Sequence, residues 1–247
     1  MKSKLFIFLF LLVTQWGLAQ NTHFWDGIEA FDGPTDENPV LASQLDFYFD
    51  KIVTPLPDSI TLEITRLIDR TSDNADLRDF ILWHLLEKYE HPEYMSQDQV
   101  FVWLYDHYFS QLEIKDLNDI NRPLIEEKAE RLRRLALFQP APEIHICDSI
   151  DLQAIENKYT VLFFYDHDCE LCHQEMQDLD SVRATHPEIT VLAIDMNTDD
   201  IRFDVLFDLY DIETTPLIYV LDRDKRIIAK KIQAKQIKLI VDNRGLQ

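Results

Sequence analysis

The sequence predicts an all-α region followed by an α/β domain with a mixed central sheet. Through the first half of the chain, apolar residues recur at the spacing of amphipathic helices. After Gln139 the pattern changes to short apolar runs, typical of buried strands, that alternate with helical segments. Pro140 and Pro142 separate the two patterns, because proline ends a helix and favours extended backbone before it. We therefore expect a helical domain at residues 20–138 and an α/β domain at residues 139–247.

The first region is expected to form a bundle of about five helices. In the first of them, Leu41, Leu45 and Tyr48 fall on one face, and each later segment repeats this three- or four-residue spacing. Pro123 is compatible with the last helix because proline is tolerated in a first turn. The expected helices cover residues 39–53, 58–70, 75–90, 96–112 and 122–138.

In the second region, strands and helices alternate. The runs YTVLFFYD and ITVLAIDM are apolar without alternation, as expected for central strands covered on both faces. Strands are expected at residues 144–147, 159–166 and 189–196, helices at 169–186, 199–212 and 234–243, and a hairpin at 214–232. Strand–helix–strand units imply right-handed crossovers and parallel pairing, and the hairpin adds an antiparallel edge.

The N-terminus has the plan of a secretory signal peptide. Lys2 and Lys4 are followed by the apolar run Leu5–Val13 and by small residues up to Ala19. The run is shorter than the roughly 20 residues that span a bilayer, although a retained anchor is the alternative. We expect residues 1–19 to be removed by cleavage near Ala19, and the protein to be exported to the periplasm or the extracellular space, where disulfides persist.

Composition excludes two classes of function. The formal net charge is −21, and both regions are acidic, so nucleic acid is not an expected partner. Only four glycines occur, and none lies between Gly33 and Gly245, which argues against the glycine-rich phosphate loops of nucleotide-binding proteins.

The pair Cys169 and Cys172 stands where the first central strand gives way to a helix. Backbone N–H groups at a helix start have no partner within the helix, and together with the helix dipole they stabilise a thiolate. Cys172, three residues later, faces the same side, and its sulfur is expected to be the more buried and less reactive one. The spacing therefore predicts an attacking thiol at Cys169 and a resolving thiol at Cys172.

Two other interpretations of the pair are weaker. A structural zinc usually takes two close pairs of ligands. Besides the pair, the sequence offers only the distant Cys147 and the flanking His167 and His173, and no second close pair, so no metal is expected. Inert packing is the second alternative for the pair. Cys147 itself is predicted to be a structural thiol, with a disulfide to the pair or to a partner as the alternative.

The order of elements, the CxxC after a central strand, and Thr215-Pro216 before the final hairpin resemble the thioredoxin family. The similarity covers about residues 139–243 and is greatest to exported bacterial thiol–disulfide oxidoreductases of the TlpA/ResA-like kind. The helical region resembles an uncharacterised domain that precedes such domains in some secreted bacterial proteins. The resemblance implies that Pro216 is cis and lies against the disulfide, and that the backbone of Thr215 binds an extended substrate peptide.

The same resemblance implies an enzyme that reduces protein disulfides outside the cytoplasm. Protein thiols and disulfides would be its substrates, a membrane reductase its electron donor, and the Cys169–Cys172 disulfide its only redox group, without a further cofactor. Two rivals remain. In one, the helical domain recognises a partner and the disulfide is structural. In the other, the protein is a peroxidase, although the threonine usual three residues before the attacking cysteine is Asp166 here.

Several positions depart from the family pattern. Asp168 replaces the aromatic residue common before the first cysteine, and Phe163 stands where many thioredoxins bury an acid. Asp166, His167 and Glu170 are therefore the candidates for a proton shuttle. Asp168 and Glu170 are expected to disfavour a neighbouring thiolate by repulsion, which would make the protein reducing.

Overall fold

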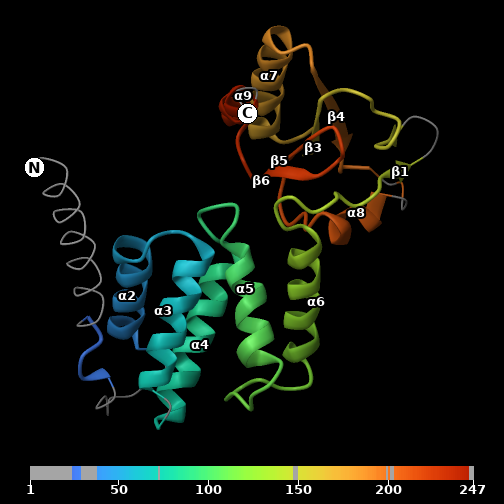
Figure 1. Ribbon diagram of the computed structural model, residues 1–247. Helices are drawn as coiled ribbons and strands as arrows, with labels where there is room; N and C mark the ends of the chain where they lie inside the picture. Colours follow the sequence, from blue (N-terminus) through green and yellow to red (C-terminus); the bar gives the residue numbers. More distant parts are fainter. Residues whose placement is uncertain are drawn as a thin grey trace, which may run out of the picture. The chain divides into compact units, whose positions relative to one another are not determined.

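The structure, a computed structural model, describes residues 24–28, 38–71, 73–146, 150–198, 200 and 203–244 (Figure 1). The expected signal peptide and Cys147 lie outside these residues. The chain divides into two compact units, Met1–Asp119 and Ile120–Gln247. The contacts thus group the last predicted helix with the second unit, whereas the sequence predicts a boundary between residues 138 and 139.

The first unit is helical, as predicted. Asn38 begins its first helix by accepting hydrogen bonds at Oδ1 from the N–H groups of Val40 and Leu41, at 3.2 and 3.0 Å. Its helices are α2 (Pro39–Phe47), α3 (Pro57–Arg70), α4 (Ala75–Glu90) and α5 (Asp98–Leu104), and α2 and α5 continue as the π-helical turns η2 (Tyr48–Ile52) and η3 (Tyr105–Phe109).

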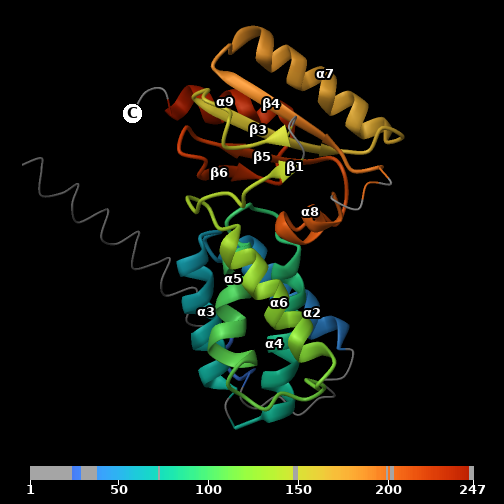
Figure 2. The same cartoon turned by 90° about the vertical axis from the view of Figure 1, so that its right-hand side faces the viewer.

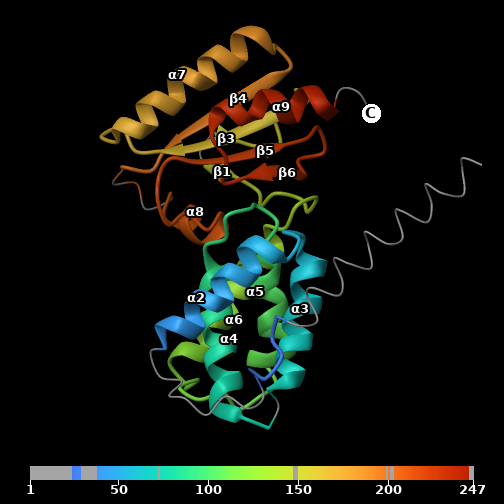
Figure 3. The ribbon, with the colours of Figure 1, turned by 90° about the vertical axis from the view of Figure 1, so that its left-hand side faces the viewer.

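The predicted apolar faces form the core of this unit. Leu45, Ile60 and Ile64 are fully buried, and the spacing that predicted the helices is thus the spacing of core contacts. Tyr48 is also buried, and its hydroxyl donates to Glu63 at 2.7 Å, so the polar end of this core residue is satisfied. Figure 3 shows α2 and α3 running beside α4 and α5.

The second unit contains a four-stranded mixed sheet in the order β4-β3-β5-β6. Central strand β3 (Tyr159–Tyr165) pairs in parallel with β4 (Ile189–Asp195) and antiparallel with β5 (Leu217–Leu221), and β5 pairs antiparallel with β6 (Ile227–Lys230). The predicted mixed sheet is confirmed, with β3 and β4 parallel and the final hairpin antiparallel. The antiparallel pairing of β5 with β3 differs from the parallel pairing that the alternation of strands and helices predicts. The short strands β1 (His145–Ile146) and β2 (Ile150–Asp151) form a separate hairpin.

Helices cover both faces of the sheet (Figures 2 and 3). Helices α7 (Glu170–Thr185) and α9 (Ala234–Arg244) pack together on one face, and α8 (Asp204–Leu209) lies on the other. Leu162 and Phe164 of β3 belong to the core cluster that includes Leu206 of α8. Phe163, which alternation turns to the opposite face, is fully buried too, and this explains why β3 is apolar throughout.

Helix α6 (Asn121–Arg134) opens the second unit. Its C-terminal carbonyl group at Leu135 accepts a hydrogen bond from the buried Lys230 ammonium at 2.6 Å. No helix among the residues that the structure describes combines the length and the apolar character needed to cross a membrane.

Candidate active site

A tight turn joins β3 to α7 and carries the cysteine pair. The N–H of Asp168 donates to Asp166 Oδ1 at 2.8 Å, and the N–H of Cys169 donates to the Asp166 carbonyl at 3.1 Å. Aspartate favours such turns because its side chain bonds the backbone two residues later. The turn ends the strand and places Cys169 at the N-cap of α7, so the prediction that this cysteine lies at a helix start is confirmed.

Cys169 caps the helix through its sulfur. The backbone N–H of Cys172 donates to Cys169 Sγ at an N···S distance of 3.1 Å. An N-cap side chain satisfies one of the N–H groups that have no partner within the helix. The sulfur therefore lies where helix-terminal amides and the helix dipole favour negative charge.

The two thiols are free and differ in exposure. Cys169 is half-buried, whereas Cys172 is 1% exposed, as the sequence predicts for an attacking and a resolving thiol. Burial raises the pKa of the Cys172 thiol, and the Cys169 sulfur raises it further. Hydrogen bonds to Cys172 from the backbone of Asp166 and the side chain of Thr215 lower this pKa, but the net shift remains upward.

The loop before β5 approaches the cysteine pair from a distant part of the chain. Cys169 Sγ lies 3.9 Å from the carbonyl oxygen of Thr215. The Thr215–Pro216 peptide bond is cis, as the family resemblance implies. The structure thus brings together Cys169, Cys172, Thr215 and Pro216, which the sequence separates by more than forty residues.

Polar residues beside the turn form a second group at the carboxyl ends of β3 and β4. His167 Nδ1 lies 2.9 Å from Asp195 Oδ2, and this hydrogen bond, with the charge of Asp195, raises the pKa of His167. Asn197 Nδ2 donates to Asp166 Oδ1 at 3.1 Å and to Asp168 Oδ2 at 3.3 Å. The hydrogen bond from the backbone N–H of Asp168 holds the pKa of Asp166 below its usual range, and Asn197 adds to this effect.

Asp195 and Asn197 were missed from the sequence, although a signal existed. In the parallel register of β3 and β4, Tyr165 lies opposite Asp195. The residues that follow two adjacent parallel strands emerge at the same edge of a sheet. The parallel pairing of the strands predicted at 159–166 and 189–196 could therefore have shown that the polar residues at the ends of these two strands lie near each other.

The candidates for a proton shuttle differ in position. Asp166 and His167 belong to the group just described, and Glu170 is exposed in the first turn of α7. Phe163 is fully buried and stacks on Tyr165 with ring centroids 5.4 Å apart. The shuttle itself remains a prediction.

A buried acid that the sequence did not point to lies one turn beyond Cys172. Glu175 is 8% exposed, and its Oε2 accepts a hydrogen bond from the N–H of Ala234 at 2.6 Å. This contact joins α7 to the start of α9 and stiffens the helix that carries the cysteines. Within the described ranges, no three or more His, Cys, Asp or Glu side chains come together in a way that would hold a metal ion.

Comparisons with known proteins agree with this architecture. Residues 139–239 match the model of the AhpC/TSA family. A thioredoxin-like protein from Bacteroides caccae superimposes with a TM-score of 0.70 at 16% identity, over 92% of this chain and 93% of that chain. This likeness concerns the fold, and it includes the helical region as well as the sheet.

Two shorter structures match less than half of this chain. A domain of a possible thiol-disulfide isomerase from Cytophaga hutchinsonii is 28% identical, with a TM-score of 0.38, over 45% of this chain and 96% of that chain. The thioredoxin domain of a thiol-disulfide oxidoreductase from Bacteroides vulgatus is 18% identical, with a TM-score of 0.40, over 44% of this chain and 98% of that chain. None of the curated proteins matches. Residues 139–239 thus match the AhpC/TSA family model, and the chain, helical region included, shares the fold of a thioredoxin-like protein.

Proposed function

We propose that the protein is an exported thiol–disulfide oxidoreductase that reduces protein disulfides through Cys169 and Cys172. One observation carries the proposal. The half-exposed sulfur of Cys169 accepts a hydrogen bond from the N–H of Cys172 at the start of α7 and lies 3.9 Å from the Thr215 carbonyl. A reactive sulfur is thereby placed between a donor that stabilises negative charge and the backbone beside a cis proline.

The reaction begins with the reduced pair. The Cys169 thiolate attacks one sulfur of a substrate disulfide held beside Thr215 and Pro216, the substrate S–S bond breaks, and the second substrate sulfur leaves as a thiolate. Cys172 then loses its proton and attacks Cys169 Sγ, and the mixed disulfide breaks to release the second substrate thiol. Two electrons pass to the substrate, and the enzyme is left with a Cys169–Cys172 disulfide.

An external dithiol donor must restore the reduced pair, because no other redox group takes part in this scheme. For an exported protein we propose a membrane reductase in this role, with protein disulfides as substrates. The signal-peptide pattern of residues 1–19 and the compartment in which protein disulfides persist support the exported location.

The test is trapping of the mixed disulfide. In a Cys147→Ser background, which removes the third thiol, Cys172→Ala should accumulate covalent adducts with a disulfide-containing peptide, because the resolving step is blocked. Cys169→Ala should form none. Adducts with Cys169→Ala alone would reverse the two roles.

A second assay separates an enzyme from a binding module with a structural disulfide. Protein reduced with dithiothreitol and freed of it should reduce insulin disulfides, whereas Cys169→Ala should not. If the wild-type protein leaves insulin oxidised and its cysteine pair resists dithiothreitol, the oxidoreductase proposal is wrong.

A further inference from the structure

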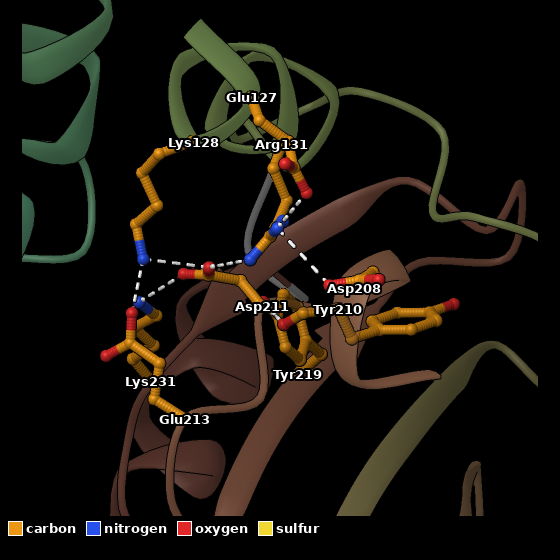
Figure 4. Close-up of polar contacts among 9 residues, drawn as sticks. All are labelled: Glu127, Lys128, Arg131, Asp208, Tyr210, Asp211, Glu213, Tyr219 and Lys231. Atoms are coloured by element: carbon orange, nitrogen blue, oxygen red, sulfur yellow. Dashed lines mark hydrogen bonds and ion pairs between the residues drawn. The ribbon is translucent and has the colours of Figure 1, made fainter. Parts of the chain in front are cut away.

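An ionic cluster around one buried carboxylate connects α6 to the segment that leads into the Thr215–Pro216 bond. It consists of Lys128, Arg131, Asp211, Glu213 and Lys231 and is called the Asp211 cluster below (Figure 4). We propose that the Asp211 cluster positions the Thr215 backbone against Cys169, so that Lys128 is a positioning residue for disulfide exchange. This inference rests on the proposed function, since it assigns a substrate-binding role to the Thr215 backbone.

Asp211 is the centre of the cluster. Its side chain is 0% exposed, and both carboxylate oxygens are used. Lys128 Nζ lies 2.8 Å from Oδ1, and Lys231 Nζ lies 3.0 Å from Oδ2. Arg131 adds a longer contact to Oδ1 at 3.4 Å, and its other terminal nitrogen reaches Asp208 at 3.3 Å. Cations from two elements therefore converge on one buried carboxylate, as Figure 4 shows.

The surroundings favour the charged forms of Asp211 and Lys128. Burial raises the pKa of Asp211, but Lys231 and Lys128 outweigh burial and hold that pKa below its usual range. Burial lowers the pKa of Lys128, and its hydrogen bonds to Asp211 and Glu213 more than offset this, so the net shift is upward. A buried ion pair that is fully hydrogen-bonded fixes geometry, and removal of one partner leaves an uncompensated buried charge.

The backbone at the centre of the cluster is also fixed. Asp211 has a φ of 52°, in the left-handed region that turns the chain away from the end of α8. The N–H of Ile212 donates to the Phe207 carbonyl at 3.0 Å, and the Tyr219 hydroxyl donates to the Tyr210 carbonyl at 2.7 Å. Both contacts anchor this segment to α8 and β5, so the chain leaves Asp211 in a defined direction.

Glu213 links the cluster to the segment that contacts the two cysteines. Its carboxylate pairs with Lys128, and it stands two residues before Thr215. Two residues of extended chain reach at most about 7 Å, so a change at Glu213 acts close to Thr215. The Thr215 carbonyl contacts Cys169 Sγ, and the Thr215 side chain hydrogen-bonds to Cys172. Lys128 therefore acts on both cysteines through one short segment.

The proposed positioning role of Lys128 does not follow from the thioredoxin-like fold alone, because Lys128 lies outside the part of the chain that matches the family model. Lys128 and Arg131 belong to α6, which precedes the family match at residues 139–239. Asp211, Glu213 and Thr215 lie within that match. The redox unit of this protein thus includes a helix outside the matched region, in agreement with the division of the chain at Ile120.

The test uses the full-length protein and three substitutions. Lys128→Met removes the ammonium and keeps the length of the side chain, and Lys128→Arg restores a cation. Arg133→Met is the matched control on α6, because Arg133 pairs with Glu130 on the surface and not with Asp211. Thermal unfolding of each variant shows that it is folded under the assay conditions.

The first readout is amide hydrogen exchange of residues 212–217. We expect Lys128→Met to accelerate exchange there by about tenfold or more, and Lys128→Arg and Arg133→Met to stay near the wild-type rate. The second readout compares reduction of an extended peptide disulfide with reduction of a small disulfide such as hydroxyethyl disulfide. For Lys128→Met, kcat/KM for the peptide should fall by about tenfold, since misplacement of a binding group by about 1 Å costs up to about a hundredfold. The small disulfide, which does not need the Thr215 backbone, should react at the wild-type rate.

Each outcome decides the inference. Exchange and peptide kinetics in Lys128→Met equal to those of Arg133→Met would overturn it. Faster exchange with equal losses for both disulfides would also overturn it, because the cluster would then serve stability alone. If the wild-type protein reduces neither disulfide, the proposed function fails, and the exchange measurement still decides whether Lys128 positions the segment.

Discussion

The sulfur of Cys169 has a structural role that can be measured separately from its redox role. It accepts the hydrogen bond from the N–H of Cys172 that begins α7. Cys169→Ser keeps a short polar side chain that can accept this bond, whereas Cys169→Ala removes the acceptor. Both variants keep the backbone bond from the N–H of His173 to the Cys169 carbonyl at 3.2 Å. The two variants therefore differ by one capping interaction.

The free-energy cost of removing the Cys169 cap can be estimated from its position at the start of α7. Replacement of a polar N-cap residue by alanine costs about 1 kcal/mol, within a range of about 0.5–2 kcal/mol. Only one first-turn N–H is capped by the sulfur and the site is half-buried, so we expect about 1 kcal/mol here. This free energy corresponds to roughly a fivefold difference in the equilibrium constant for local opening of the first turn.

Amide hydrogen exchange at Cys172 is the appropriate assay, because a chain with two compact units does not unfold as one two-state transition. The Cys172 amide should exchange roughly five times faster in Cys169→Ala than in Cys169→Ser, and amides in the middle of α7 should be equal in both. Equal exchange of the Cys172 amide in the two variants would show that the side chain at this position does not stabilise the helix start. The same N–H would then not stabilise a Cys169 thiolate in the way proposed for the active site.

Three further predictions concern charge and packing. Because the hydrogen bond to Asp195 raises the pKa of His167, Asp195→Asn should lower that pKa toward the ordinary value of about 6.5, measured by NMR titration of the imidazole; an unchanged midpoint would contradict the pairing. The pKa of Asp211 is lowered in the folded state, so its stabilisation is present above the unfolded-state pKa of about 3.9 and is lost as the pH falls through the folded-state pKa. Asp211→Asn should therefore be less stable than wild type at pH 7 and should lose less stability than wild type on acidification to pH 3, as measured by the protection against hydrogen exchange of the slowest amides in the second unit. Phe164→Ala should destabilise the second unit by about 3–5 kcal/mol, because Phe164 is fully buried in the core cluster; a loss below about 1 kcal/mol would place that side chain outside the core.

The elements around the site were predictable because each depends on local sequence. Strand β3 is apolar on both faces since both faces are covered, and the polar turn after it marks its end. The start of α7 at Glu170 follows from the same change in pattern. The mixed topology followed only in part from the order of elements. The unit β3–α7–β4 is parallel and the hairpin β5–β6 is antiparallel, as predicted. The antiparallel pairing of β5 with β3 was not predictable in this way, because β5 also follows a helix.

The contacts that join distant segments were not predictable in this way. In the sequence, Lys128 and Arg131 look like the solvent-facing charges of an amphipathic helix, and their partner Asp211 lies 83 and 80 residues later. Nothing local distinguishes a buried ion pair from two surface charges. For the same reason the boundary was placed after α6, where prolines and extended residues interrupt the helical pattern, and not at Ile120, where the contacts of α6 with the second unit place it.

The burial of Cys172 favours loss of its proton after the attack of Cys169 on the substrate and not before it. Phe163, six residues before Cys169, cannot accept a proton, and the environment of the Cys172 thiol contributes to the control of when its proton leaves. Burial raises the pKa of Cys172, and negative charge on Cys169 raises it further. Once Cys169 is joined to a substrate in a mixed disulfide, its charge is gone and that contribution disappears, whereas the hydrogen bonds from Asp166 and Thr215, which favour a Cys172 thiolate, remain. Deprotonation of Cys172 thus becomes easier after the first attack than before it, and a thiol that is held protonated in the resting enzyme becomes available at the step that requires it.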